Sequence, residues 1–288
     1  MNSIATIARM TFREAIRRRI VVTGLLLGIC FLTIYSIGFH FIIGQVRDPG
    51  NSILNGTGQK ALANLAMVEA SNGLMLAGLY AVAFLCIAMA ALLAADTLAG
   101  EIGSGTIQTI VTKPIRRSAV VFGKWIGFAL LLGLYFVLMG GGTVLSVWLQ
   151  VGYKPEHLLA GLGLIYLEAL LIMTLSMACS SAFSALATGG VVFGLYGLAF
   201  IGGWIEQFGA LIRNATAIKV GIIASLIIPS ETLWRRAAYE MQTPLAGALG
   251  GSPFSTFSVP SPLMVAYTVV YLLVALWVAV RVFQKRDM

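Results

Sequence analysis

The residues that could bind a metal or act as nucleophiles are few in this 288-residue sequence, and they lie far apart. The three cysteines, Cys30, Cys86 and Cys179, each lie in an apolar stretch, and the only histidines are His40 and His157. Zinc sites and disulfide frameworks need cysteine or histidine clusters at short spacing. We therefore expect no metal site and no disulfide, and we expect the cysteines to pack as small apolar side chains.

Motifs for nucleotide binding and for hydrolysis are also absent from the sequence. A P-loop needs an upstream glycine and a Ser or Thr after its Gly-Lys pair, but Gly123-Lys124 is followed by Trp125. The Gly-Ser-Gly run at 103–105 lacks the pattern of a nucleophile elbow. The chain is therefore expected to be no enzyme and to hold no cofactor of its own.

One acidic residue lies inside a long apolar stretch. Glu168 is near the middle of residues 158–182. A charged side chain at the centre of a membrane span costs roughly 2.5–3.5 kcal/mol on insertion scales, so it faces the bundle interior or water. Two interpretations stay open. Glu168 lines a transport pathway or holds a gate through a partner such as Lys219, or it is a buried carboxyl, protonated or hydrogen-bonded to a neighbouring span.

The polar segment 96–119 has the pattern of a short exposed helix. Glycines interrupt the preceding helix, Thr106 can cap a new one, and Pro114 ends it. The apolar face of this helix consists of Ile107, Ile110 and Val111. Two turns are too few for a stable isolated helix, so this face needs a partner. The alternative is an ordinary basic loop that only fixes topology.

The composition defines the elements that must position these residues. Apolar residues make up 59% of the chain and charged residues 10%, whereas soluble domains are about 25% charged. Six stretches are long enough to cross a bilayer as helices: 20–43, 74–95, 120–149, 158–182, 186–205 and 263–280. The sequence therefore predicts an all-α membrane protein with six spans and a single domain over 1–288. A soluble protein, a disordered chain, a β-barrel and, despite the net charge of +8, a nucleic-acid binder are excluded.

The basic residues predict the orientation of the spans. Twelve of the 19 lie in three short segments that six spans place on one side. They are Arg9, Arg13, Arg17, Arg18, Arg19, Lys113, Arg116, Arg117, Lys124, Arg281, Lys285 and Arg286. By the positive-inside rule both termini are cytoplasmic. Residues 46–73, the turn at 153–157 and the segment 207–262 are then external.

The pattern of the first 19 residues predicts an amphipathic helix at the membrane surface. Arg9, Arg13 and Arg17 recur every four residues and share one face, while small and apolar residues occupy the others. The alternative is a plain basic segment that flanks the first span.

The external segment 207–262 is predicted to contain two helices as well as loop. Thr216–Ile228 is apolar but has only 13 residues, which suits a re-entrant or interfacial helix. Ser230 can cap a second helix with Glu231 in its first turn. The apolar stripe of that second helix is Trp234, Ala237, Ala238 and Met241. In the alternative topology 216–228 is a seventh crossing, which places the C-terminus outside.

Two further features have structural interpretations. His40 and Glu206 lie near the external ends of spans one and five, where such side chains can reach the interface, so we expect neither to bind metal. The Gly-x-x-x-Gly motifs at 24–28 and 190–194 predict close approach of helices.

The segment around 96–124 resembles the ABC-2 type permeases, the membrane subunits of bacterial ATP-binding-cassette exporters. The matching residues are Glu101, Thr106, Pro114, Arg117 and Gly123-Lys124. The opening Thr11-Phe12-Arg13-Glu14-Ala15-Ile16-Arg17 is similar to a subgroup that includes the permease of the nitrous-oxide-reductase copper-maturation transporter. One departure is Gly103-Ser104-Gly105, where relatives often carry charged residues, and this can alter the contact with the ATPase.

The resemblance implies a location, partners and a role for each matched residue. The chain would sit in the bacterial cytoplasmic membrane, with ATP and Mg²⁺ bound by a separate ATPase. Two permeases and two ATPases would assemble around a two-fold axis. The coupling residues would be Glu101, Thr106, Ile107, Ile110, Val111, Pro114, Arg116 and Arg117. Membrane lipid is a further partner, and the family leaves room for an extracytoplasmic one.

Two other classes of protein are weighed against the permease. A transporter or channel without an ATPase would show pore-loop motifs or paired halves with several intramembrane charges, and the sequence shows neither. An intramembrane enzyme needs paired catalytic side chains within its spans, which are absent. The substrate stays open in every case, because fold does not define it.

Overall fold

The structure is a computed structural model that describes residues 3–47, 57–103, 117–249, 256 and 258–285. Within them every regular element is a helix, and six helices are long and apolar enough to cross a membrane. They are α2 (Arg19–Arg47), α3 (Thr57–Gly103), α5 (Arg117–Val151), α6 (Leu158–Ser180), α7 (Ala185–Leu211) and α11 (Pro262–Lys285). The protein is therefore a multi-pass membrane protein, and the prediction of an all-α fold with six spans is confirmed.

The second span begins earlier than predicted. Residues 46–73 were expected outside the membrane, but α3 starts at Thr57 and its apolar span starts at Leu62. The polar Ser71 and Asn72 broke the apolar pattern in the sequence. In the structure both are buried, and Asn72 Nδ2 donates to Met241 O and to Tyr153 Oη at 2.8 Å. Because these bonds satisfy the NH2 group of the amide within the bundle, the helix continues through it.

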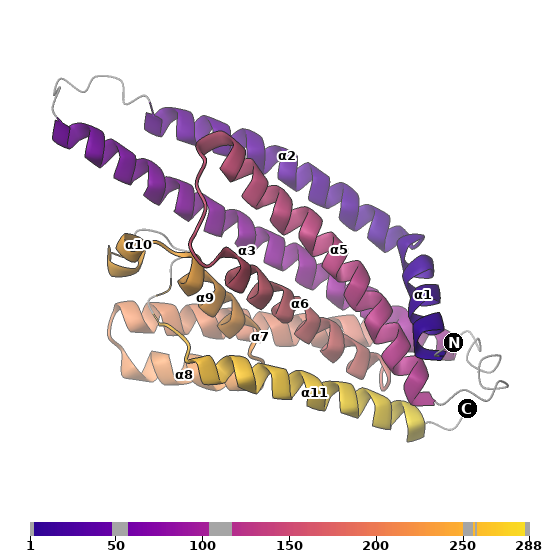
Figure 1. The fold of residues 1–288 in the computed structure, drawn as a ribbon. Coiled ribbons are helices and arrows are strands. Elements are labelled where there is room, and N and C mark those ends of the chain that lie inside the picture. Colours follow the sequence, from indigo (N-terminus) through magenta and orange to yellow (C-terminus); the bar gives the residue numbers. More distant parts are fainter. Residues whose placement is uncertain (1–2, 48–56, 104–116, 250–255, 257, 286–288) are drawn as a thin grey trace.

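The two termini lie at the same end of the bundle. Figure 1 shows α1 (Ser3–Ile16), the C-terminal end of α3, the start of α5 and the C-terminal end of α11 together there. We call this the terminus end. Helix α1 lies at the edge of the molecule. Its Ala8, Thr11 and Ala15 are buried, while Arg9 and Arg13 are exposed, as its amphipathic pattern predicts.

The segment between α7 and α11 folds as a bent helix pair. Helices α8 (Ala215–Ile227) and α9 (Ser230–Met241) meet at an angle of 109°, and α10 (Pro244–Leu249) follows them. In Figure 1, α11 starts at the end of the bundle where α7 finishes, so the pair enters and leaves from the same end. We call this pair the hairpin, and the end from which it enters the hairpin end. The hairpin fits the predicted re-entrant segment.

The start of α9 differs from the prediction. Ser230 was expected to precede this helix and cap it, but Ser230 is its first residue, and the residue before the helix is Pro229. Pro229 has φ −83° and no side-chain acceptor, so no side-chain hydrogen bond caps α9. The four residues of the predicted apolar stripe on α9 are all buried.

Candidate functional site

The predicted coupling segment lies largely outside the described residues. Residues 104–116 contain Thr106, Ile107, Ile110, Val111, Pro114 and Arg116, and the structure describes none of them. The two flanking residues of the set are placed by their helices. Glu101 belongs to the last turn of α3, and Arg117 is the first residue of α5. Both helix ends are at the terminus end of the bundle (Figure 1).

Helix α1 packs closely on α5 at the terminus end. A methyl group added at Gly123 would lie 2.7 Å from Ile7 Cβ, and one added at Gly127 would lie 2.8 Å from the carbonyl oxygen of Ala8. Glycines four residues apart therefore form a flat strip on α5 that receives α1. Gly123 is one of the residues of the family resemblance, and its role here is this close approach.

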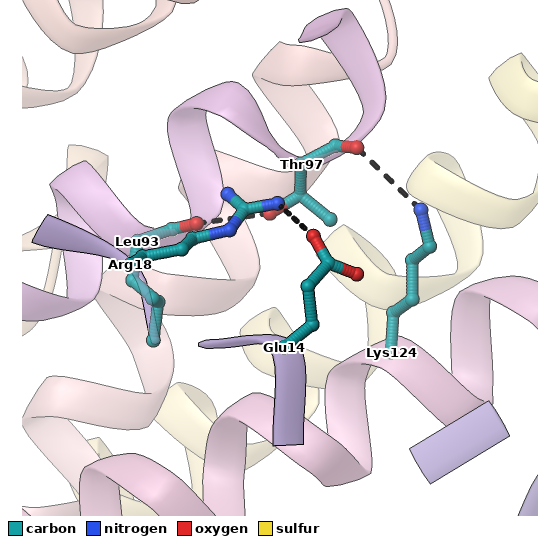
Figure 2. Close-up of polar contacts among 5 residues, drawn as sticks. All are labelled: Glu14, Arg18, Leu93, Thr97 and Lys124. Atoms are coloured by element: carbon teal, nitrogen blue, oxygen red, sulfur yellow. Dashed lines mark hydrogen bonds and ion pairs between the residues drawn. The ribbon is translucent and has the colours of Figure 1, made fainter. Parts of the chain in front are cut away.

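Lys124, the other half of the Gly123-Lys124 pair, connects the two helices that flank the segment. Its side chain is 5% exposed, and Nζ donates to the carbonyl oxygen of Thr97 on α3 at 3.5 Å. Thr97 Oγ1 donates to the carbonyl oxygen of Leu93 at 2.9 Å. Figure 2 shows this cluster beside Glu14 and Arg18, which form an ion pair at 2.8 Å. Lys124 thus joins the end of α3 to the start of α5, and α1 packs on α5 beside it.

At the hairpin end, small residues bring α8 and α9 against α7. A methyl group at Gly202 would overlap Ala224, one at Gly221 would overlap Glu206, and one at Gly203 would overlap Glu231. These contacts leave no room for a side chain at any of the three positions. The hairpin therefore lies directly on the backbone of α7.

A buried ion pair joins the hairpin to α7. Arg235 of α9 is 2% exposed and Glu206 of α7 is 4% exposed, and Arg235 Nη1 lies 2.6 Å from Glu206 Oε1. Ser258 Oγ donates to the same carboxylate oxygen at 2.7 Å. The expectation that Glu206 reaches the interface is therefore wrong. The span extends to Leu211, beyond the predicted end at 205, so Glu206 lies within it and is covered by α8.

Two more carboxyl groups lie near this pair. Glu231 precedes Arg235 by one helical turn on α9, and Glu168 of α6 is close enough for its charge to interact with that of Glu231. Glu168 and Glu231 are buried, and each has one carboxyl oxygen with no hydrogen-bond donor among the described residues. Tyr80 of α3 lies beside Glu231. Three carboxyl groups and one guanidinium are thus buried together in the bundle, and we call them the buried charge cluster.

The structure corrects the partner expected for Glu168. Glu168 faces the bundle interior, as predicted, but Lys219 is exposed on α8 and makes no ion pair within the described part of the chain. The charged group near Glu168 is Glu231 instead. Glu231 and Arg235 were not predicted as site residues, because their segment was expected to lie outside the membrane. Their i, i+4 spacing beside Trp234 was the available signal, since opposite charges at that spacing share a helix face.

The hairpin end also carries a large cavity. It has a volume of about 910 Å³ and lies between the 153–157 turn, α9 and the segment that follows it. Its charged lining residues are Lys154, Glu156, Arg236 and Glu240. Arg236 donates to Glu240 at 2.5 Å and lies 5.1 Å from the centre of the Tyr239 ring. The cavity has both signs of charge, and the described residues form no cluster that could hold a metal ion.

Comparison with known proteins gives one family. A family model described as ABC-2 family transporter protein matches residues 5–288. The match covers almost the whole chain, including both ends of the bundle and the hairpin. Comparison with curated proteins gave no match.

Proposed function

The chain belongs to the ABC-2 transporter family and is a membrane permease subunit of an ABC transporter, and we propose that residues 101–117 couple it to a separate ATPase. ATP and Mg²⁺ are bound on that ATPase and not on this chain. Two permeases and two ATPases form the working unit, and transport is export across the bacterial cytoplasmic membrane. Both termini then face the cytoplasm, with the terminus end toward the ATPase.

The contact between Lys124 and Thr97 carries this proposal. The segment 104–116 joins two helix ends that are already connected through a buried lysine. A pull on the segment therefore moves α3 and α5 together. Helix α3 contacts α2, α5, α6, α7 and α9, so this motion reaches most of the bundle. Two-state repacking of spans around such helices is a common switching mode in transporters.

Within the segment, each residue has a proposed role. Ile107, Ile110 and Val111 pack into a groove on the ATPase, with Thr106 and Pro114 at the two ends of the helix. Glu101 holds the base of the element by pairing with a basic residue of α1 or of the ATPase. Arg116 and Arg117 bind lipid headgroups or acidic ATPase residues.

The hairpin forms the external gate in this proposal. Glu168 belongs to that gate through its neighbour Glu231, and the ion pair of Arg235 with Glu206 holds the gate closed. The cavity of about 910 Å³ next to the hairpin is where an extracytoplasmic partner would bind. The volume of this cavity supports a binding role, because it falls within the range of ligand pockets.

Copurification tests the coupling proposal. Burying three aliphatic side chains contributes roughly 1.5–3 kcal/mol each when burial is complete, so one charge among them should separate the subunits. In cells that express permease and ATPase together, we expect Ile110→Asp to remain in the membrane but to lose the ATPase. Ile110→Leu and Met10→Asp are the controls, because the first keeps the apolar face and the second adds a charge on exposed α1. Full recovery of the complex with Ile110→Asp would exclude this segment as the coupling element.

Cysteine labelling tests the orientation. Gln242→Cys should react with an impermeant maleimide added outside the cell, and Gln284→Cys should react only after the membrane is opened. External reactivity of Gln284→Cys would place the C-terminus outside and make the six-span topology wrong.

A further inference from the structure

A mostly apolar groove opens between α2, α3 and α5 near the terminus end. Its volume is about 300 Å³. Arg19, Thr23 and Leu27 line it from α2, and Leu85, Ala88 and Leu92 line it from α3. The permease function proposed above uses none of these side chains.

The polarity of this groove changes in one direction. Arg19, Thr23 and Leu27 are four residues apart, so they share one face of α2. At 1.5 Å per residue, Thr23 is about 6 Å and Leu27 about 12 Å deeper than Arg19 along the helix. From the terminus end inward, the groove therefore offers a cation, then a hydroxyl, then an apolar wall. A phospholipid has the same order of groups, with phosphate first, then ester oxygens, then an acyl chain.

The charge at the mouth of the groove has no partner in the described part of the chain. The neighbouring Arg18 pairs with Glu14, but the exposed Arg19 makes no ion pair there. A guanidinium binds phosphate oxygens through paired N–H donors. Positive charge of this kind, next to a membrane, attracts anionic lipids.

The groove faces the region that lipid occupies around a single chain. Only 11% of the best apolar window of α2 is buried within the chain, against 61% for α3. Leu27 and Leu92 on the two walls are exposed. Tyr135 closes the floor, where its hydroxyl donates to the carbonyl oxygen of Gly24 at 3.2 Å. The surface left open is thus apolar and long in the direction of an acyl chain.

We propose that this groove binds one anionic phospholipid of the leaflet at the terminus end. Its phosphate pairs with Arg19, its ester oxygens accept a hydrogen bond from Thr23, and one acyl chain lies between Leu27 and the α3 wall. The helix of a second copy would supply apolar surface but would also have to bring a carboxylate to Arg19. The lipid supplies both groups at once.

Native mass spectrometry of the purified protein tests the site. The protein is equilibrated with equal amounts of phosphatidylglycerol and phosphatidylcholine. Wild type should retain one phosphatidylglycerol per chain, with a preference of about fivefold, the effect of one basic residue near a membrane surface. Arg19→Gln should lower the preference to about one, and Ala88→Phe should fill the groove and remove the retained lipid. Arg281→Gln and Ala266→Phe, at exposed positions on α11, are the matched controls and should behave as wild type.

Three results would overturn the proposal. The first is an unchanged phosphatidylglycerol adduct in both Arg19→Gln and Ala88→Phe, provided that these variants elute as wild type in size-exclusion chromatography. The second is competition for the adduct by inorganic phosphate, which would assign the site to a free anion. The third is efficient crosslinking of Leu27→Cys between two copies by a bifunctional maleimide in a background without the native cysteines. That result would show that protein covers the groove.

Discussion

The two ends of this permease are held together by different kinds of contact. Helices meet through glycines at both ends. The polar contacts at the terminus end include a bond from Lys124 to a helix carbonyl and an ion pair whose Glu14 side chain is 61% exposed. At the hairpin end, a guanidinium and a carboxylate pair with less than a tenth of either side chain exposed. Exposed pairs contribute about 0–1 kcal/mol, but removal of one partner of a buried pair costs about 3–5 kcal/mol.

This difference suggests a division of roles. An exposed ion pair can rearrange at little cost, which suits the end that in our proposal receives motion from the ATPase. A buried ion pair resists partial opening, because a separated charge in the bundle is far more costly than a paired one. The hairpin should therefore be either fully closed or fully open, which is the behaviour of a gate. Changes to the contacts at the two ends should therefore differ in their effects on stability and on activity.

The largest expected effect comes from breaking the buried ion pair. Glu206→Gln leaves Arg235 without its carboxylate, and we expect the free energy of unfolding to fall by about 3–5 kcal/mol. Thermal unfolding in detergent measures it. The matched variant is Glu14→Gln at the terminus end, which should cost at most about 1 kcal/mol.

The double variant Glu206→Leu with Arg235→Met refines that comparison. It removes both charges of the ion pair and should recover part of the lost stability, since neither member then stays buried alone. The recovery is limited because Glu231, whose charge also interacts with that of Arg235, loses this neighbour. If Glu14→Gln and Glu206→Gln destabilise the protein equally, the two ends do not differ as described.

A smaller effect on stability is expected from a substitution that forces α7 and α8 apart. In Gly221→Ala the added methyl group has no space beside Glu206, so we expect a loss of about 1–3 kcal/mol and easier protease cleavage of the hairpin. Gly190→Ala is the control, since a methyl group there meets no atom within 4 Å. Equal stability of the two variants would mean that α8 is not pressed against α7.

The smallest effect on stability is expected at Lys124, together with a large effect on activity. A hydrogen bond from a charged donor contributes about 1.5–3 kcal/mol, but Lys124→Met keeps the buried methylenes and also removes the cost of burying the ammonium. The net loss of stability should therefore be about 0.5–1.5 kcal/mol. The ATPase should still copurify, but the permease should no longer change its hydrolysis rate. Lys219→Met on exposed α8 is the control. Normal stimulation of hydrolysis by Lys124→Met would remove Lys124 from the coupling route.

The spans of this fold could be predicted from the sequence because each is a continuous apolar run. The bent pair could also be anticipated, since 13 apolar residues before a proline are too few for a crossing. The start of α3 could not, because the hydrogen bonds that let Asn72 lie inside the bundle come from Tyr153 and Met241, far away in sequence. Local apolar pattern has no information about such distant partners.

The candidate site was predicted less well than the fold, for related reasons. Glu168 stood out because it interrupts an apolar run, but its neighbour Glu231 depends on how the hairpin folds back. The two Gly-x-x-x-Gly motifs also show that a local sequence pattern does not define the contacts between helices. A methyl group at Gly24 would lie 3.0 Å from Met89 Sδ, so the 24–28 motif does bring helices together, whereas Gly190 and Gly194 meet no atom within 4 Å in this chain. The same spacing thus has two outcomes, and only the packing of other helices decides between them.

The central claim is that ATP acts at the terminus end and opens the hairpin. The most direct test is the reactivity of a cysteine introduced in place of Thr232, which is 2% exposed on α9. Permease with Thr232→Cys as its only cysteine is placed with its ATPase in vesicles, and an impermeant maleimide is added on the hairpin side. We predict little labelling without nucleotide, strong labelling with ATP, and no response to ATP when Ile110→Asp is also present. Equal labelling with and without ATP, or an ATP response that survives Ile110→Asp, would contradict the claim.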